Sequence, residues 1–164
     1  MQTKQQNPNP AKAQTQSQGQ GRPPQVKDLM TRNPVFISSN ATVQDAARKM
    51  ENVDCGILPV GTPEKIEGVI TDRDIVIRVI ALGKDANTEK VRDYMTPGVV
   101  SCREDDTVDR AADMMRENNV NRLIVKNQTG KPSGILSFGR LLREEVNMSE
   151  IASVIERAVG PKAA

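Results

Sequence analysis

The sequence predicts an α/β fold: two pseudo-symmetric β-α-β-β-α units packed sheet to sheet, with a C-terminal helix and a disordered N-terminal tail. An internal repeat is the first reason, because VKDLMT at 26–31 returns as VRDYMT at 91–96. The second reason is the order of hydrophobic patterns, since each repeat runs strand, helix, strand, strand, helix. A repeat of this length buries its apolar face only against a neighbour, so the two units should enclose a groove between them.

Composition and the repeat divide the chain into five segments. The first 25 residues hold eight Gln and four Pro and almost no aliphatic side chain, which is typical of a disordered tail. Near the C-terminus, apolar residues at helical spacing predict an amphipathic helix, formed by Ile151, Val154, Ile155, Ala158 and Val159. The predicted segments are the tail 1–25, the first unit 26–83, a linker 84–90, the second unit 91–146, and the C-terminal helix and tail 147–164.

The strands of each unit are expected to be short. Each unit opens with an amphipathic turn, at 26–30 and 91–95, and a proline after it prevents a longer helix. Runs with β character then predict the strands, at 35–37, 57–60 and 66–70 in the first unit and at 99–102, 123–125 and 133–136 in the second.

The first helix of each unit is predicted from its start signal and its apolar stripe. Thr42 and Thr107 stand where an N-cap belongs, and Asp45 follows Thr42 as in a capping box. The repeat offset of 65 residues also aligns these two threonines. Apolar residues then recur at i, i+3, i+4 and i+7, as Val43, Ala46, Ala47 and Met50 and as Val108, Ala111, Ala112 and Met115.

A second helix should close each unit, at 72–82 and at 138–146. The helix at 72–82 is followed by Gly83, a typical helix-ending residue, and it is apolar nearly all round. Such a helix is expected to be buried on more than one side. One side should pack on its own sheet, and the other on the second unit or on another chain.

The composition argues against several classes of function. The chain has no His, which removes histidine-based acid/base chemistry and Ser-His or Cys-His nucleophile pairs, so we do not expect an enzyme. Outside the tail, 20 basic and 21 acidic side chains nearly balance, and one Tyr, two Phe and no Trp offer few stacking rings, so nucleic acid is not an expected partner. With two Cys, no secretory signal and no apolar run of about 18 residues, we expect a cytoplasmic protein that does not bind membranes.

One motif carries the chemistry of a binding site. At Thr71–Asp74 a predicted strand gives way to a helix, whose first N–H groups suit a phosphate. The Thr71 hydroxyl can add a hydrogen bond, and Asp74 can accept hydrogen bonds from the vicinal hydroxyls of a ribose. An alternative stays open, in which Thr71 is only an N-cap and the aspartates only favour the helix dipole. No metal site is predicted.

The doubled units, the Met-Thr openings, the Leu58-Pro59-Val60 strand and the Gly68–Asp74 motif resemble a tandem CBS-domain pair, or Bateman module. Small stand-alone bacterial proteins of this family are similar to residues 26–145. The resemblance implies a pseudo-two-fold pair that often forms dimers. It also implies that an adenosine compound, such as AMP, ADP, ATP or S-adenosylmethionine, binds between the units.

The resemblance also implies which residues bind the ligand. Each pocket is built from both units, so Thr71 and Asp74 should face Thr96, Ser101, Val120 and Asn121 from the second unit. Arg122 is a candidate phosphate ligand, and its equivalent in the first unit is Ile57. The alternative for these second-unit residues is ordinary packing of loops and strand ends, or a surface arginine.

A second, degenerate site is expected on the other side of the pair. Its motif contains Ser137 and places Arg140 where the aspartate would be, and a cation cannot accept hydrogen bonds from ribose hydroxyls. The facing residues would be Thr31, Phe36, Cys55 and Gly56. This site is therefore expected to be empty, to take a different ligand or to be structural.

Together these observations predict a regulatory protein that binds an adenosine compound in the cleft between its units and requires no cofactor. We expect a homodimer that acts on an effector protein of unknown identity. The alternative is a structural, dimerisation or protein-interaction module whose nucleotide sites are vestigial.

Overall fold

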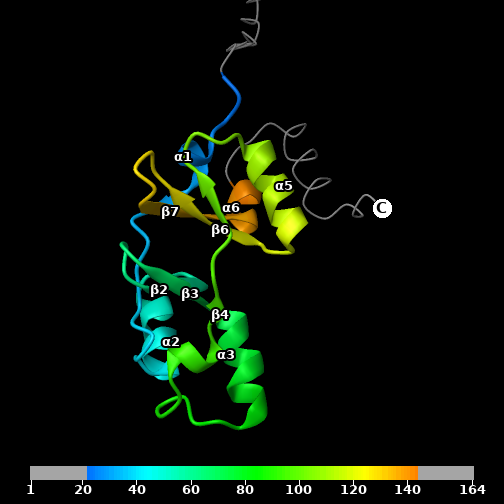
Figure 1. Ribbon diagram of the computed structural model, residues 1–164. Coiled ribbons are helices and arrows are strands. Elements are labelled where there is room, and N and C mark those ends of the chain that lie inside the picture. Colours follow the sequence, from blue (N-terminus) through cyan, green and yellow to red (C-terminus); the bar gives the residue numbers. More distant parts are fainter. Residues whose placement is uncertain (1–21, 144–164) are drawn as a thin grey trace, which may run out of the picture.

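The computed structural model describes residues 22–143, so the predicted C-terminal helix and most of the tail lie outside the described residues. The chain forms two α/β units stacked on one another (Figure 1). One unit contains α2, β2, β3 and α3, and the other contains α5, β6, β7 and α6. The predicted doubled α/β fold is thus confirmed. Among residues 22–143, no helix is both long and apolar enough to cross a membrane.

Each unit has its own sheet, and each sheet takes one strand from the opening of the other unit. The first unit's sheet has the order β2-β3-β4, and the second unit's sheet has the order β1-β7-β6-β5. Val69 pairs with Thr96 and Thr31 pairs with Ile135, both antiparallel. The strands are β1 (Thr31–Arg32), β2 (Ile57–Gly61), β3 (Ile66–Thr71), β4 (Thr96–Pro97), β5 (Ser101–Arg103), β6 (Arg122–Lys126) and β7 (Pro132–Ser137).

The helices begin where the sequence predicts. Thr42 Oγ1 accepts a hydrogen bond from Asp45 N at 3.0 Å, and Asp45 Oδ2 accepts one from Thr42 N at 3.1 Å, so the capping box is complete. Thr107 Oγ1 accepts from Arg110 N at 3.2 Å. The helices are α1 (Val26–Leu29), α2 (Val43–Asn52), α3 (Asp72–Arg78), α4 (Val91–Tyr94), α5 (Val108–Asn118) and α6 (Phe138–Arg143), with a 3-10 turn η1 (Ile80–Leu82).

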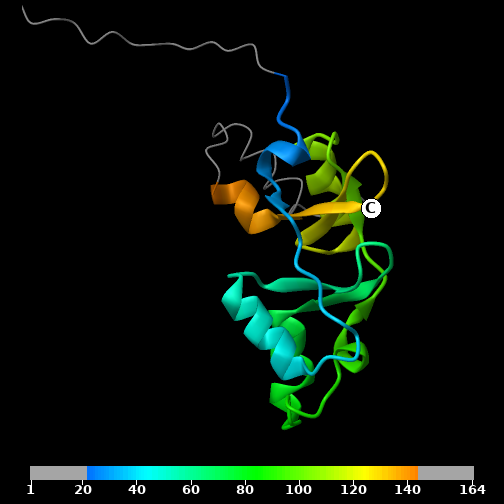
Figure 2. The same cartoon turned by 90° about the vertical axis from the view of Figure 1, so that its left-hand side faces the viewer.

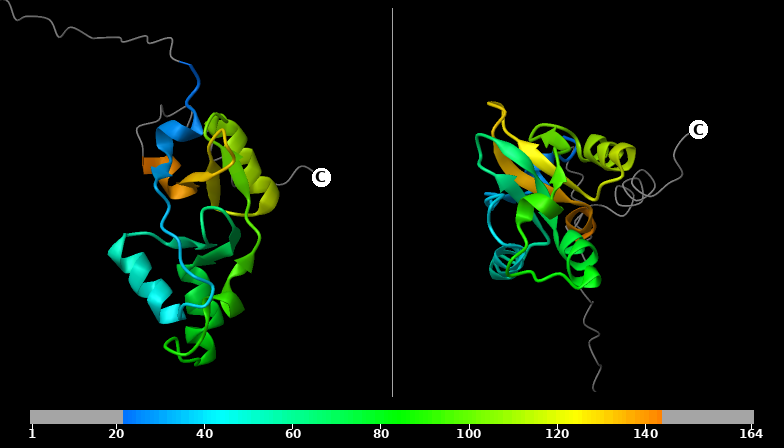
Figure 3. Two further views of the ribbon diagram at one scale, coloured as in Figure 1. Left: turned by 60° about the vertical axis from the view of Figure 1, so that its left-hand side comes forward. Right: turned by 60° about the horizontal axis from the view of Figure 1, so that its bottom comes forward.

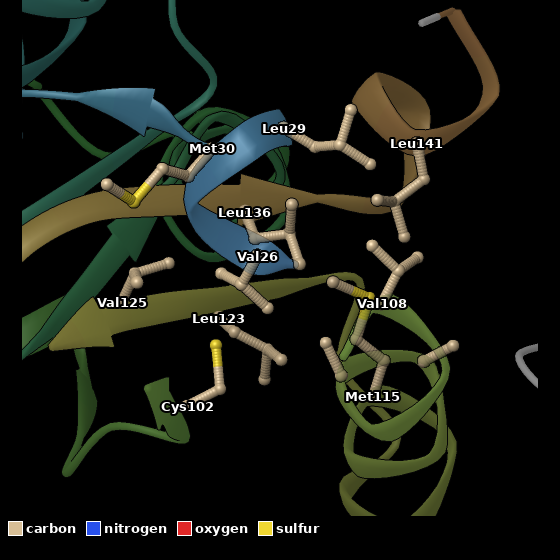
Figure 4. Packing of buried hydrophobic residues seen from close by; sticks show 12 residues of the cluster. Val26, Leu29, Met30, Cys102, Val108, Met115, Leu123, Val125, Leu136 and Leu141 are labelled. Carbon is tan, nitrogen blue, oxygen red and sulfur yellow. The ribbon is translucent and has the colours of Figure 1, made fainter. Parts of the chain in front are cut away.

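The exchange of opening segments extends to the hydrophobic cores. Val26 and Leu29 of α1 pack in the core of the second unit, beside Leu123, Leu136 and other residues of α5, β6 and β7 (Figure 4). In return, α4 gives Val91 and Tyr94 to the core of the first unit. The two segments that cross between the units lie on opposite sides of the molecule (Figures 1 and 3). Figure 2 shows the first of them running from α1 down to α2.

Two equivalent glycines, Gly68 and Gly134, permit this exchange. A Cβ on Gly68 would lie 2.3 Å from the Thr96 carbonyl oxygen, and one on Gly134 would lie 2.8 Å from that of Thr31. Real Cβ atoms do not approach backbone oxygens so closely. Glycine at these positions therefore lets β4 and β1 reach the neighbouring strand.

Two expectations need correction. The β run at 35–37 is reduced to a single bridge between Ile37 and Val60. The closing helix at 72–82 ends at Arg78, and after η1 the chain turns at Gly83 with a φ of 65°. In the single chain the second side of this helix is exposed, and its packing against another chain stays a prediction. Val76, Ile77, Ile80 and Leu82 are 49–65% exposed.

Candidate functional site

A first cavity of about 240 Å³ lies between the units, beside the segment that crosses from β4 to β5. Its walls come from both units, since β2 and β3 contribute Ile57 and Val69 while the second unit contributes the start of β6. The second-unit side and the crossing segment together contribute Thr96, Pro97, Gly98, Val99, Val100, Val120, Arg122 and Ile124. The wall is mainly aliphatic, with one hydroxyl and one guanidinium.

Three of the residues predicted for the first site meet in this cavity, namely Thr96, Val120 and Arg122. Ser101 and Asn121 follow lining residues in the chain but do not line the cavity themselves. Ser101 pairs with Ile124 in the sheet, and the Asn121 carbonyl oxygen accepts a hydrogen bond from Phe138 N at 2.9 Å.

Thr71 and Asp74 form a complete capping box at the start of α3. Asp74 Oδ2 accepts hydrogen bonds from Thr71 N at 3.0 Å and from Thr71 Oγ1 at 2.7 Å, while Asp74 N donates to Thr71 Oγ1 at 3.1 Å. Asp74 Oδ1 lies 3.4 Å from Arg78 Nη2, and the Asp74 side chain is only 14% exposed. The capping role left open by the sequence is therefore confirmed, and the ribose role stays a prediction.

Neither Thr71 nor Asp74 lines the first cavity, but Thr71 adjoins one of its lining residues. Thr71 pairs with Ile57 across the sheet, and Ile57 lines the cavity. Thr71 also lies two residues after Val69 on β3, so both side chains point to the same face of the sheet. The Asp74 carboxylate is held by its hydrogen bonds to Thr71, and its approach to a ligand in the first cavity stays a prediction.

A second cavity, of about 430 Å³, lies near Gly56 and the start of α6. Five of the six residues predicted for the second site line it: Thr31, Cys55, Gly56, Ser137 and Arg140. Phe36 does not line it, and its carbonyl oxygen accepts a hydrogen bond from Lys49 Nζ at 2.8 Å. The remaining lining residues are Val53, Asp54, Ile57, Arg122 and Ile135.

Arg140 is anchored at the wall of the second cavity. Its Nε donates to the Leu29 carbonyl oxygen at 2.8 Å, which ties α6 to α1. Its backbone N donates to Ser137 Oγ at 3.2 Å, in the same capping position that Thr71 has in the first unit. A guanidinium therefore stands at this cavity where the first unit has a carboxylate.

Arg122 and Ile57 line both cavities, which the sequence did not predict. They are equivalent positions of the repeat, and each begins the first central strand of its unit. The only available signal was this equivalence, because residues at matching positions near a pseudo-two-fold axis come together at the shared wall. A Cβ on Gly56 would lie 2.8 Å from Arg122 Nη2 and 2.6 Å from Asp72 Oδ2, so both charged groups lie close to the Gly56 backbone.

The two thiols differ in their surroundings. Cys102 is buried in the core, and burial, with a smaller effect of Asp106, raises the pKa of its thiol to about 12. Cys55 is half-buried at the second cavity and donates to the Ile57 carbonyl oxygen at 3.2 Å. No cluster of three metal-ligating side chains occurs in the described part of the chain.

We predict that iodoacetamide modifies Cys55 and leaves Cys102 intact in the folded protein. The thiolate is the reactive form, and at pH 8 a thiol with a pKa near 12 is almost entirely protonated as well as inaccessible. Mass spectrometry of tryptic peptides over a time course measures both sites. Equal modification of the two thiols under native conditions would contradict the described burial.

The fold is that of a two-unit module, with the two cavities described above lined by residues of both units. A family model described as the CBS domain matches residues 26–81 and 91–147, and the chain therefore belongs to the CBS-domain family, with two such domains in tandem. Its relatives include YlbB of Bacillus subtilis (strain 168), which is 37% identical over 127 residues that cover 75% of this chain and 84% of YlbB. The CBS domain-containing protein YhcV of the same organism is 31% identical over 130 residues, covering 79% of this chain and 91% of YhcV.

A solved structure with the same fold contains bound adenosine compounds. It is the CBS domain pair of protein MJ0100 in complex with 5′-methylthioadenosine and S-adenosyl-L-methionine. Its sequence identity to this chain is 27%, with a TM-score of 0.64 and coverage of 74% of this chain and 95% of that one.

Proposed function

We propose that the protein is a regulatory, non-catalytic CBS pair that binds an adenosine compound in the first cavity. The observation that carries this proposal is the composition of the cavity wall. Val69 and Val120 offer aliphatic surfaces for a purine ring, and Arg122 offers a cation for a phosphate or other anionic group. The adenosine compounds bound to the MJ0100 pair support the same ligand class.

The carboxylate of Asp74 would bind the ribose hydroxyls at the edge of this cavity. A carboxylate has about four acceptor positions, and the hydrogen bonds from Thr71 use only Oδ2. Oδ1 faces Arg78 at 3.4 Å, but the Arg78 side chain is 47% exposed, and ion pairs of this kind contribute little. A ribose can therefore engage Oδ1 while the capping box stays intact.

A titration with AMP, ADP, ATP and S-adenosylmethionine tests the proposal. At 100 times its dissociation constant, a ligand adds about 2.7 kcal/mol to the free energy of unfolding, or roughly 10 °C in melting temperature. We expect at least one of the four compounds to give such a shift, and Asp74→Ala to remove it. Differential scanning fluorimetry and calorimetric titration measure the effect.

Asp45→Ala is the matched control, because Asp45 completes the same kind of capping box with Thr42 at the start of α2. Both variants should lose about 1 kcal/mol of stability from the cap, but Asp45→Ala should keep the full ligand shift. A ligand shift in Asp74→Ala equal to that of the wild type would contradict the assigned role. No shift with any compound would favour the structural alternative, which the occupied Thr71–Asp74 cap and the Arg140 replacement support.

A homodimer is the second part of the proposal. The aliphatic face of α3 and η1, formed by Val76, Ile77, Ile80 and Leu82, is exposed in the single chain. Four neighbouring exposed aliphatic side chains are typical of an interaction surface. The family resemblance implies a dimer, and we assign this face to a second copy of the chain, in a symmetric interface where the same residues meet from both sides.

A further inference from the structure

The wall between the two cavities contains a single guanidinium. Ile57 and Arg122 both line the first and the second cavity, and they are equivalent positions of the repeat. A symmetric wall would contain either two isoleucines or two arginines. Because one position is aliphatic, the shared wall offers a single cation, Arg122, to an anion in either cavity.

The Arg122 guanidinium is available for an anion. It is half-buried, yet it makes no hydrogen bond or ion pair with any residue from 22 to 143. Its Nη2 lies near the Gly56 backbone, at the wall of the second cavity. A partly desolvated cation without a partner is unfavourable, and a bound oxyanion would relieve this cost. Asp72 Oδ2 is also near Gly56, while its Oδ1 accepts from Arg73 N at 2.8 Å.

The second cavity offers further donors for a compact oxyanion. Arg140 lines it and is held in place by the hydrogen bond from its Nε to the Leu29 carbonyl oxygen. The hydroxyls of Thr31 and Ser137 line it as well. The one carboxylate in its wall, Asp54, is exposed. Orthophosphate near neutral pH keeps a P–OH group, which can donate a hydrogen bond to this carboxylate.

We propose that the second cavity is a phosphate site and that it shares Arg122 with the first cavity. A phosphate group bound in one cavity withdraws the guanidinium from the other. Occupation of the second cavity therefore weakens binding of a phosphorylated ligand in the first cavity and does not affect an uncharged ligand there. The statement about the first cavity rests on the proposed function, and the statement about the second cavity does not.

Protection of Cys55 tests the second cavity without any nucleotide. The probe is inorganic phosphate, and the readout is the rate of Cys55 alkylation by iodoacetamide, with Cys102 as an internal control. When the phosphate concentration is ten times the dissociation constant, the alkylation of Cys55 should be about tenfold slower, because only about a tenth of the molecules then have an unoccupied second cavity. Arg122→Gln and Arg140→Gln should each lose this protection. Arg48→Gln, which removes an exposed arginine of α2 that lines neither cavity, should keep it.

No protection in the wild type, or full protection in both cavity variants, would overturn the phosphate site. Arg122→Gln is the decisive variant, because the guanidinium makes no hydrogen bond or ion pair with the described residues, and the melting temperature of the variant should be no lower than that of the wild type. Melting curves without phosphate check that each variant is folded.

Competition between the cavities is tested with AMP and adenosine, which differ by the phosphate group. Inorganic phosphate should weaken AMP binding to the wild type and leave adenosine binding unchanged. Arg140→Gln, which changes the lining of the second cavity and not that of the first, should remove this effect on AMP. An unchanged effect in Arg140→Gln would mean direct competition inside the first cavity and would overturn the shared-arginine proposal. If AMP, ADP, ATP, S-adenosylmethionine and adenosine all fail to bind, the proposed function fails, while the Cys55 experiment still decides the phosphate site.

Discussion

Replacing Gly68 with Ala is expected to lower the free energy of unfolding by about 3 kcal/mol, or roughly 10 °C in melting temperature. The new Cβ would lie 2.3 Å from the carbonyl oxygen of Thr96 and 3.1 Å from its carbonyl carbon. Both are backbone atoms of β4, so no side-chain rotation can relieve the overlap. The strand must move away from β3, which also shifts Thr96 and Pro97 in the wall of the first cavity.

Gly130→Ala is the control for this effect. Gly130 has a φ of 78°, but nothing lies within 4 Å of a Cβ there. This variant should therefore lose only the cost of a left-handed residue, about 1 kcal/mol. Thermal and urea denaturation of both variants measure the difference. If Gly68→Ala lost no more stability than Gly130→Ala, the close approach of β4 to β3 would not matter for the fold.

The double variant Ile77→Asp, Ile80→Asp is expected to convert the proposed dimer into monomers. Each aliphatic side chain contributes about 1 kcal/mol or more to the binding free energy when it is buried. In a symmetric interface each substitution is present in both protomers, so its effect on the binding free energy is doubled. The dissociation constant should therefore rise by roughly three orders of magnitude, since each 1.4 kcal/mol is a factor of ten. Sedimentation velocity should show twice the 18.0 kDa chain mass for the wild type and the single mass for the variant.

Folding of the single chain should survive this double change, because Ile77 and Ile80 are 49% and 57% exposed. Val53→Asp is the control, since Val53 is 42% exposed but lies outside α3 and η1. It should leave the dimer intact. A wild-type chain that sediments as a monomer at all concentrations would refute the dimer. Dissociation by Val53→Asp to the same extent would show that another face forms the interface.

The sequence predicts those parts of the fold that depend on local signals. The capping boxes and the helices α2 and α5 follow from Thr42, Thr107 and the apolar spacing after them. The four central strands follow from runs of β-branched residues between turn signals. The exchange of β1 and β4 is absent from the prediction, because a two-residue strand with exposed side chains carries no pattern that specifies its partner.

The sequence predicts the residues of a candidate site where the repeat determines their backbone positions. It does not predict them where the orientation of a side chain depends on local hydrogen bonds. Five of the six residues for the second cavity come together, because Gly56, Ser137 and their neighbours lie on backbone that the repeat fixes. The carboxylate of Asp74 does not line the first cavity and accepts a hydrogen bond from Thr71 instead, and the spacing of residues in the sequence cannot predict this local competing bond. The position of Arg122 in the wall of both cavities depends on how the two units pack together, so no local sequence pattern predicts it.

The crossing of the opening segments has a consequence for how the chain acquires its structure during synthesis. The helix α1 is made well before β7, yet Thr31 pairs with Ile135 near the far end of the described chain, and Val26 belongs to the same core as Leu136. Contacts between such distant residues slow folding because a long loop must close before they form. The helix α1 therefore stays without its partner strand until β7 is made, and the core of each unit is complete only when the opening segment of the other unit is in place.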